Sequence, residues 1–378
     1  MSIKYTNIVD GLPASVPFVG PEAQERTLNQ VFKARIGANE SVFGPSLKAV
    51  MAMQKEIIKT WQYGDPENYD LINALAVKHK VSPKNIVVGE GIDGLLGYLV
   101  RLIIQKGDNV VTTDGAYPTF NYHVNGYGGC LHKVPFKNDT EDLENLLNKV
   151  IETSAKILYV SNPNNPMGTI NTPKAIEKLI ENLPKSTLLC LDEAYSDFLP
   201  TNLIPKISIN QSNVIRMRTF SKAYGMAGLR VGYAIGEQNI ILNFEKIRNH
   251  FGMCRVSQVG ALAALDDNVF INDVIQKVGS ARKRISDIAL SNNCKFVNSY
   301  TNFIAIDCLK DDVFAKKVLE NLIKKRIFVR MPYSFPQNRC IRVTVGLDKD
   351  IDLFEKYFPI ALKESWYFYL IFSHNNLK

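Results

Sequence analysis

The strongest constraint on the fold is a repeated alternation of short apolar strands with helices between residues 68 and 235. Strands are predicted at 86–88, 109–113, 156–160, 187–191, 214–218 and 230–235, and helices at 68–80, 92–104 and 173–182. Apolar strands separated by helices predict a mainly parallel sheet that is covered on both faces. Reactive groups in such folds collect at the carboxyl ends of the strands.

The two ends of the chain have a different pattern. Residues 1–36 predict an irregular arm, because several prolines oppose helix formation there. The carboxyl-terminal third predicts a smaller α+β domain, with helices at 257–291 and 313–325 and strands at 302–307, 327–330 and 340–345. We therefore expect an arm with part of the small domain at 1–45, a large domain at 46–255 and a small domain at 256–378.

Composition excludes several classes of partner. The net charge of +8 comes from scattered Lys and Arg, without the basic tract and interleaved aromatics typical of nucleic-acid binding. The six cysteines lie far apart and show no metal-binding spacing, so we expect no metal. Neither a signal segment nor a stretch that could span a bilayer is evident, so we expect a cytoplasmic protein without a membrane partner.

One motif is ambiguous. Residues 89–94 match GxGxxG between a predicted strand and a predicted helix, as a dinucleotide fingerprint requires. Backbone N–H groups at the start of a helix can bind any phosphate, however. The motif alone therefore fits an NAD enzyme, a different phosphate ligand or a tight turn.

The most informative segment is residues 219–230, directly after the strand at 214–218. Lys222 stands there at the carboxyl end of a strand and could form a Schiff base with an aldehyde cofactor. Ser221, Thr219 and Arg230 supply two hydroxyls and a planar cation for a phosphate. An isolated lysine after a strand is usually a surface residue, but that interpretation leaves Arg230 and the small residues 225–228 unexplained.

Three further segments follow predicted strands. Asp192 ends a buried strand, where its carboxylate could pair with a protonated pyridine nitrogen or simply cap the next helix. Tyr195 could donate a hydrogen bond to a ring oxygen. The proline-rich residues 161–168 could fix an Asn amide beside the ring or form a plain turn. Phe120 could stack on a flat cofactor or pack in the core.

Together these segments resemble fold-type I pyridoxal-phosphate (PLP) aminotransferases, in particular the histidinol-phosphate aminotransferase branch. The matching pieces are residues 38–45, 63–66, 89–94, 118–120, 162–168, 192–195, 221–230 and 341–346. The resemblance implies a large domain with a mainly parallel seven-stranded sheet in an α/β/α sandwich, plus a smaller α+β domain. It also implies the cofactor pyridoxal 5'-phosphate and a homodimer.

The resemblance assigns roles around the cofactor ring. Lys222 would carry the cofactor covalently and act as the general base. Asp192 would pair with the pyridine nitrogen, and Tyr195 with Asn165 would bind the ring oxygen. Phe120 would stack on the ring.

The resemblance also assigns the remaining site residues. The cofactor phosphate would be bound by Gly91, Ile92, Asp93, Thr219, Ser221 and Arg230. Tyr63 would reach it from the neighbouring subunit. The substrate residues would be Arg342, which binds the carboxylate, Arg330, which matches a phosphate-binding position, and Asn39.

The implied activity is ping-pong amino transfer from an amine resembling histidinol phosphate to an oxo acid such as 2-oxoglutarate. The aromatic and proline-rich residues 331–338 could reshape the pocket beside Arg330. An aromatic amino acid aminotransferase and a decarboxylase of a phosphorylated amino acid therefore remain alternatives, together with an NAD oxidoreductase and a regulatory PLP-binding protein.

Overall fold

The computed structural model describes residues 3–14 and 19–375 and shows two compact units. The described residues of the first unit are 3–14, 44–164 and 170–272, and those of the second are 19–43, 165–169 and 273–375. Each unit has its own β-structure. The domain limits that we predicted after residues 45 and 255 stay a prediction.

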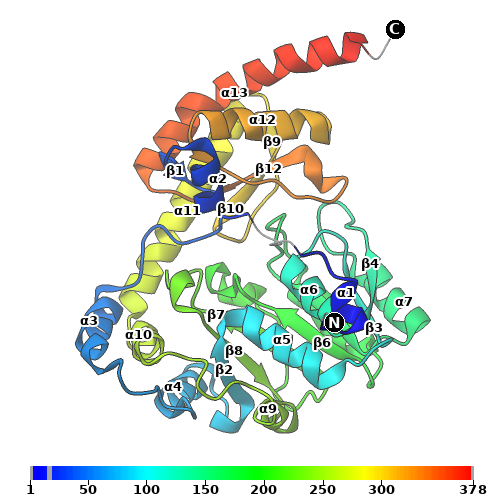
Figure 1. The fold of residues 1–378 in the computed structure, drawn as a ribbon, viewed down its shortest axis with the longest axis vertical. Coiled ribbons are helices and arrows are strands. Elements are labelled where there is room, and N and C mark those ends of the chain that lie inside the picture. The colour runs from blue at the N-terminus through cyan, green and yellow to red at the C-terminus, as the bar shows by residue number, and fades with distance from the viewer. Residues whose placement is uncertain (1–2, 15–18, 376–378) are drawn as a thin grey trace. The chain divides into compact units, whose positions relative to one another are not determined.

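The first unit is built on a seven-stranded sheet with the order β2-β8-β7-β6-β5-β3-β4 (Figure 1). Its strands are β2 (Ile86–Glu90), β3 (Asn109–Thr113), β4 (Cys130–Val134), β5 (Ile157–Ser161), β6 (Leu188–Asp192), β7 (Val214–Thr219) and β8 (Val231–Gly236). Strands β7, β6, β5, β3 and β4 are parallel, and only β8 runs antiparallel to its neighbours. The mainly parallel seven-stranded sheet is therefore confirmed.

Helices cover both faces of this sheet. The helices of this unit are α1 (Asn7–Asp10), α3 (Leu47–Glu56), α4 (Tyr69–His79), α5 (Gly91–Ile103), α6 (Pro118–Gly126), α7 (Leu143–Thr153), α8 (Pro173–Asn182), α9 (Gln238–Phe244) and α10 (Arg255–Leu265). Short 3-10 helices lie at Ile57–Lys59, Pro83–Asn85, Ser196–Phe198, Thr201–Leu203 and Ala227–Leu229. Alternate strand residues pack on opposite faces: Val87 joins a core with α5, α6 and α9, whereas Val88 joins one with α4 and α10. Helices α7 and α8 pack against β5 and β6 in a third core. The result is an α/β/α sandwich.

The second unit contains a three-stranded antiparallel sheet of order β12-β10-β9 and a parallel pair β1-β11. Its strands are β1 (Ala34–Arg35), β9 (Lys295–Phe296), β10 (Phe303–Asp307), β11 (Ile327–Phe328) and β12 (Cys340–Thr344). Its helices are α2 (Pro21–Leu28), α11 (Asn268–Ser291, from residue 273 onward), α12 (Asp312–Lys324), the 3-10 helix Gln337–Arg339 and α13 (Asp348–Asn375). This is the smaller α+β part that the sequence predicts.

Two local predictions are wrong. The single helix expected at 257–291 is two helices, α10 and α11, because Asp267 accepts a hydrogen bond from the Phe270 N–H (3.2 Å) and so caps a new helix. The arm is not irregular throughout, because Pro21 begins α2. Proline is tolerated in the first helical turn, where its missing N–H costs nothing.

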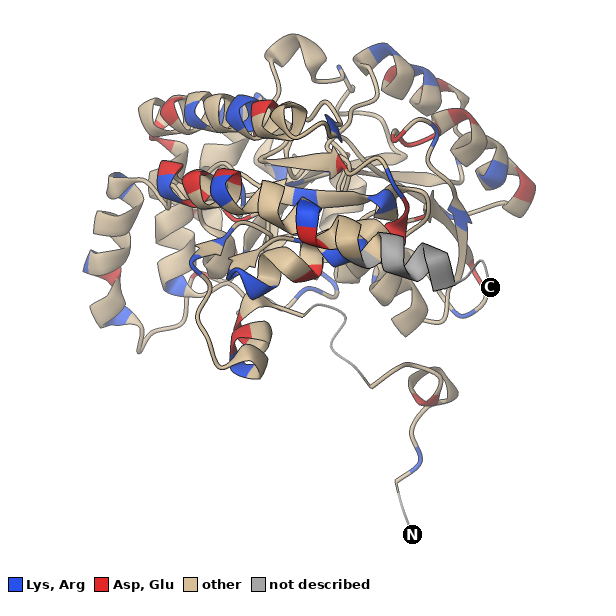
Figure 2. Ribbon diagram, turned by 90° about the horizontal axis from the view of Figure 1, so that it is seen from above, with Lys and Arg blue, Asp and Glu red and all other residues tan. Residues whose placement is uncertain are grey.

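Charged residues of both signs are interspersed along the helices (Figure 2). Several pair with an opposite charge one helical turn away, as Lys277 does with Asp273 (2.5 Å) and Lys283 with Asp287 (2.7 Å). The basic net charge is therefore spread over the ribbon and is not gathered in one tract. Within the described ranges, each helix is too short or too polar to cross a membrane.

Candidate active site

The carboxyl ends of β2, β3, β5, β6 and β7 meet at one edge of the large sheet, since these strands all run in the same direction. Four polar side chains end or follow them: Thr113 ends β3, Ser161 ends β5, Asp192 ends β6, and Lys222 follows β7 by three residues. The strand directions alone therefore bring these residues to the edge where α/β folds bind ligands.

Asp192 is the most unusual group at this edge. It is 4% exposed, and its Oδ2 accepts a 2.6 Å hydrogen bond from the Tyr159 hydroxyl while Oδ1 accepts one of 2.9 Å from the Ala194 N–H. Burial raises the pKa of Asp192 to about 6, although both hydrogen bonds lower it. A buried carboxylate of this kind is strongly stabilised by a cation placed beside it.

Lys222 lies on the turn after β7 and is half-buried. Its Nζ is 5.4 Å from the centre of the Tyr195 ring, and its charge acts on the Asp192 carboxyl. The turn needs a glycine at 225, because φ there is 67° and an added Cβ would collide with the Gly44 carbonyl oxygen. The small residues after Lys222 thus have a structural reason.

A second cluster lies beside the start of α5. The Thr219 Oγ1 and Ser221 Oγ are 2.9 Å apart, and the Arg230 Nη1 lies 3.5 Å from the Ser221 oxygen. The Arg230 Nη2 is 3.3 Å from a carboxylate oxygen of Asp93 in the first turn of α5. Two hydroxyls and a guanidinium therefore surround a helix N-terminus, a donor set that fits a phosphate dianion.

Glycines keep the backbone open at this cluster. An added Cβ at Gly91, where φ is 75°, would run into the Arg230 guanidinium. An added Cβ at Gly232 would lie 2.7 Å from the Ile92 nitrogen. Gly91, Ile92 and Asp93 therefore present backbone close to the arginine, as the sequence predicts for phosphate contact.

The aromatic next to these groups is Tyr117, three residues before Phe120, to which the sequence analysis gave the stacking role. Its hydroxyl donates a 2.7 Å hydrogen bond to Asp93, and burial and the Asp93 charge both raise its pKa, so Tyr117 is a neutral donor. Its pKa also responds to the Asp192 charge, so the ring lies near both acids. Phe120 is 0% exposed and stacks on Tyr159, with centroids 4.5 Å apart and planes at 13°.

Glu193, the next residue after Asp192, has different partners. Arg216 donates to both of its carboxylate oxygens at 3.1 and 2.7 Å, and the Arg218 Nε donates at 2.8 Å. Burial alone would raise the pKa of Glu193, but the two arginines outweigh it and lower the pKa. This acid is therefore neutralised by the protein itself.

The expected substrate residues lie in the second unit, and so does Asn165. The Arg342 Nη1 donates a 2.6 Å hydrogen bond to the Asn165 Oδ1. Arg330 and Arg342 are bridge partners through two backbone hydrogen bonds, and the Arg330 Nη2 also donates to the Val19 carbonyl at 2.8 Å. Asn39 is buried and accepts a 3.0 Å hydrogen bond from the Thr344 hydroxyl. Two arginines and two asparagines are thus grouped around β12.

Tyr63 belongs to the first unit and is 78% exposed. Its ring packs on Phe251, with centroids 4.9 Å apart. The exposure of Tyr63 is compatible with a contact to a second subunit and equally with an ordinary surface position.

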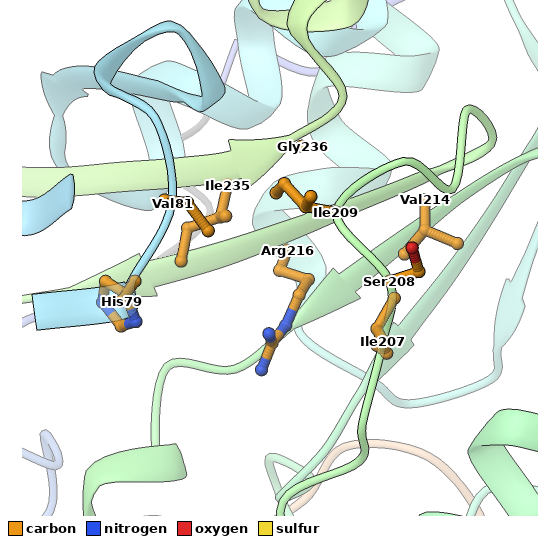
Figure 3. A pocket seen from close by; sticks show the side chains of 9 residues that line it. All are labelled: His79, Val81, Ile207, Ser208, Ile209, Val214, Arg216, Ile235 and Gly236. Atoms are coloured by element: carbon orange, nitrogen blue, oxygen red, sulfur yellow. The ribbon is translucent and has the colours of Figure 1, made fainter. Parts of the chain in front are cut away.

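A pocket at the other end of the strands does not belong to this site (Figure 3). It is lined by His79, Val81, Ile207, Ser208, Ile209, Val214, Arg216, Ile235 and Gly236. Val214 begins β7 and Gly236 ends the antiparallel β8, whereas Lys222 follows the opposite end of β7. The pocket and Lys222 are therefore at opposite ends of the same strands.

Comparison with known proteins places this geometry in context. The family described as aminotransferase class I and II matches residues 33–353. The histidinol-phosphate aminotransferase of Moorella thermoacetica is 32% identical over 343 residues, which are 90% of this chain and 88% of that protein. That of Staphylococcus haemolyticus is 32% identical over 84% of this chain and 88% of its own length.

Solved structures agree. The histidinol-phosphate aminotransferase of Sinorhizobium meliloti in complex with pyridoxal-5'-phosphate is 45% identical, with a TM-score of 0.93, and covers 96% of this chain and 99% of that chain. Aspartate aminotransferase of Thermus thermophilus with maleate shares the fold at 18% identity, with a TM-score of 0.80 over 96% of this chain and 100% of that one.

These comparisons do not favour the decarboxylase, aromatic aminotransferase, oxidoreductase or regulatory alternatives. The chemistry of the groups at this edge of the sheet also fits PLP. Lys222 offers an amine to the cofactor aldehyde, and Asp192 is a buried acid that a cation would stabilise. The cluster beside α5 supplies hydrogen-bond donors for the phosphate. The chain belongs to the class I and II aminotransferases of PLP-dependent fold type I, and it is a PLP-dependent aminotransferase.

Proposed function

We propose that this aminotransferase transfers the amino group of a phosphorylated amine resembling histidinol phosphate to an oxo acid such as 2-oxoglutarate. The observation that carries the proposal is the pairing of Arg330 with Arg342 on adjacent backbone segments, which gives two guanidinium groups to one substrate region. Guanidinium groups bind carboxylate and phosphate in a bidentate manner. Relatives named histidinol-phosphate aminotransferase support the same substrate class.

The proposed roles of the cofactor residues follow from their contacts. When bound, PLP supplies an aldehyde for Schiff-base chemistry and a pyridine ring that takes up electrons. Thr219, Ser221 and Arg230 bind the phosphate. Lys222 presents its amine to the aldehyde and then moves the substrate α-proton as general base, and Asp192 holds the ring nitrogen proton.

Tyr159 and the Ala194 N–H keep Asp192 ionised in that role. Both hydrogen bonds favour the carboxylate form and lower the pKa of Asp192 against the effect of burial. A protonated ring nitrogen beside the carboxylate would lower it further. Tyr195, whose ring lies next to the Lys222 amine, is proposed to donate to the ring oxygen together with Asn165.

We propose Tyr117, in place of Phe120, as the aromatic that covers the cofactor ring. Tyr117 is near both Asp93 and Asp192, whereas the faces of Phe120 are enclosed in the core with Tyr159. Replacing Tyr117 with alanine should weaken cofactor binding by a factor of ten or so, the amount expected for one aromatic contact of about 1 kcal/mol plus a hydrogen bond. Wild-type affinity would contradict the assignment.

We also propose a homodimer to which Tyr63 contributes across the interface. Large apolar side chains are exposed around it, including Ile58 (78%), Trp61 (80%) and Phe251 (55%). Such a patch marks an interaction surface. Light scattering should give a dimer, and Trp61→Asp should shift it to monomer; a wild-type monomer would contradict the proposal. A cytoplasmic location is proposed as well and is testable by cell fractionation.

The function itself is tested with a donor panel. Histidinol phosphate, histidinol and an aromatic amino acid are each incubated with 2-oxoglutarate, and glutamate is measured. We expect the phosphorylated donor to be preferred, and Arg330→Ala to raise its KM about tenfold or more while that of histidinol changes little. Equal effects on both donors would mean that Arg330 does not bind the substrate phosphate.

The covalent residue is tested separately. Borohydride reduction of the PLP-loaded enzyme should attach the cofactor to Lys222, as peptide mass spectrometry can show. Lys222→Ala should abolish both the attachment and turnover. Attachment at another lysine would refute the assignment of the catalytic amine.

A further inference from the structure

Glu141 is a buried acid that none of the roles above uses. It lies just before α7 and is 2% exposed. Its Oε1 accepts three hydrogen bonds: from the Ser161 N–H (3.2 Å), the Ser161 hydroxyl (2.8 Å) and the Asn164 amide (2.6 Å). Ser161 ends β5, and Asn164 lies three residues further on. The carboxyl thus holds the beginning of the loop at 161–171.

The backbone of Glu141 holds the other end of the same loop. The Asn171 amide donates a 3.1 Å hydrogen bond to the Glu141 carbonyl. Asn171 is also joined to Asn162, whose Oδ1 accepts from the Asn171 N–H (2.8 Å) and whose amide donates to the Asn171 carbonyl (3.2 Å). Both ends of the loop are therefore fixed to one residue and to each other.

This loop is connected to the cofactor acid. The Asn162 N–H donates a 2.9 Å hydrogen bond to the Asp192 carbonyl, and Ser161 pairs with Asp192 in the β5–β6 register. The loop also contains Asn165, which directly follows Asn164 in the chain. A displacement of the ends of the loop would therefore move the backbone at Asp192 and at Asn165.

We propose that Glu141 is a positioning residue for amino transfer, which holds the loop at 161–171 so that Asn165 and Asp192 keep their orientation toward the cofactor. The proposal rests on the proposed cofactor roles of those two residues. It does not make Glu141 a catalytic residue, because its hydrogen bonds to Ser161 and Asn164 act on the loop and not on a reacting group.

The protonation of Glu141 gives the proposal a distinctive signature. Burial raises the pKa of Glu141 to about 7, against its hydrogen bonds to Ser161 and Asn164. Its Oε2 is buried without a hydrogen-bond partner, and so is the Thr113 hydroxyl, which lies close enough to lower the Glu141 pKa but outside hydrogen-bond geometry.

The surroundings of Glu141 contain few other charges. The phenol of Tyr159 on β5 responds to it, and Asp142, the next residue, caps α7 through the Asn145 N–H. Burial is the largest influence on the pKa of Glu141, and hydrogen bonds from Ser161 and Asn164 come next. Because an open loop would let Glu141 ionise near its ordinary pKa of 4.5, the closed loop should lose stability as the pH rises from about 4.5 to about 7.

Three variants separate the possibilities. Glu141→Gln keeps an acceptor for Ser161 and Asn164 and imitates the neutral acid. Glu141→Ala removes the acceptor that the Ser161 N–H, the Ser161 hydroxyl and the Asn164 amide share. Glu144→Gln, at an exposed position in the first turn of α7, is the matched control.

We expect Glu141→Ala to raise the PLP dissociation constant about tenfold or more, since it removes the shared acceptor of three buried hydrogen bonds. Amide hydrogen exchange at 161–171 should increase in the same variant, both with and without PLP. Glu141→Gln should restore both quantities at pH 6. In the wild type, the protection factor of this loop, which corrects the exchange rate for its intrinsic base catalysis, should fall as the pH rises from about 5 to about 7 and then stay level, and the Gln variant should not show this fall.

The outcomes distinguish the two proposals. If borohydride does not label Lys222, the proposed cofactor chemistry fails, whatever Glu141 does. If Lys222 is labelled but Glu141→Ala keeps wild-type loop exchange and PLP affinity, Glu141 does not position the loop. If Glu141→Ala does not fold, the pH profile decides: identical profiles for the wild type and Glu141→Gln would overturn the proposal.

Discussion

Tyr159→Phe tests how the protein controls the charge of Asp192, the acid that we propose pairs with the cofactor ring. The change removes one oxygen atom, the donor of the 2.6 Å hydrogen bond to Asp192. The stacked contact with Phe120 is kept, because the ring that makes it stays in place. The variant therefore separates the hydrogen bond from the packing of β5.

The size of the expected rise in the Asp192 pKa follows from the burial of Tyr159 and Asp192. Tyr159 and Asp192 are 0% and 4% exposed, so water cannot easily replace the lost donor. A hydrogen bond to a charged group contributes about 1.5–3 kcal/mol, and about 1.4 kcal/mol corresponds to one pH unit. The pKa of Asp192, about 6 in the cofactor-free protein, should therefore rise to between about 7 and 8.

The assay is the rate of PLP association as a function of pH, followed by absorbance. If ionised Asp192 attracts the protonated ring nitrogen, the acid limb of the profile should move up by about 1–2 pH units in the variant. Tyr233→Phe is the control, because it removes an equally buried hydroxyl that contacts His79 at 3.0 Å instead. An unmoved acid limb in Tyr159→Phe, or the same displacement in the control, would refute the reasoning.

Three other changes probe the scaffold. Glu193→Gln should lower the free energy of unfolding by about 3–5 kcal/mol in urea titrations, because it leaves two arginine side chains without their anion; a loss below 1 kcal/mol would contradict this. Gly225→Ala should sharply reduce the yield of PLP-loaded protein, whereas Gly228→Ala, whose Cβ would meet open space, should not. Burial lowers the pKa of His79 from 6.5 to about 3, so an unfolded chain binds a proton that the native protein excludes. The stability of the wild type relative to His79→Gln should therefore be constant above pH 6.5 and fall as the pH drops toward 3, and a flat difference would count against a buried neutral imidazole.

The fold and part of the site could be predicted from sequence because strand direction determines them. Once β6 and β7 are recognised as parallel, Asp192 and the turn with Lys222 must lie at the same edge. The hydroxyls and the arginine of residues 219–230 follow from the same turn. No long-range information is needed to bring these groups together.

Other site residues could not be found in this way. Tyr159 lies inside an apolar strand, where an aromatic residue predicts core packing, and only the tertiary structure shows its hydroxyl on Asp192. Glu141 stands in a polar segment that is typical of solvent exposure, yet it is buried. Phe120 follows the motif more closely than Tyr117, but the structure places it against Tyr159 in the core.

The neighbours Asp192 and Glu193 show how charge compensation separates a functional acid from a structural one. Both are buried, but consecutive residues at the end of a strand point to opposite faces. Glu193 meets Arg216 and Arg218, and its pKa is lowered despite burial. Asp192 has neutral donors at hydrogen-bond distance, and the Lys222 charge is only the smallest of the effects on it, so its pKa stays raised. An acid that the protein desolvates and leaves without a paired cation costs stability unless a ligand supplies the positive charge. A cofactor with a protonated ring nitrogen would remove that cost on binding, and the environment of Asp192 is for that reason the main support for the role that we propose for this acid.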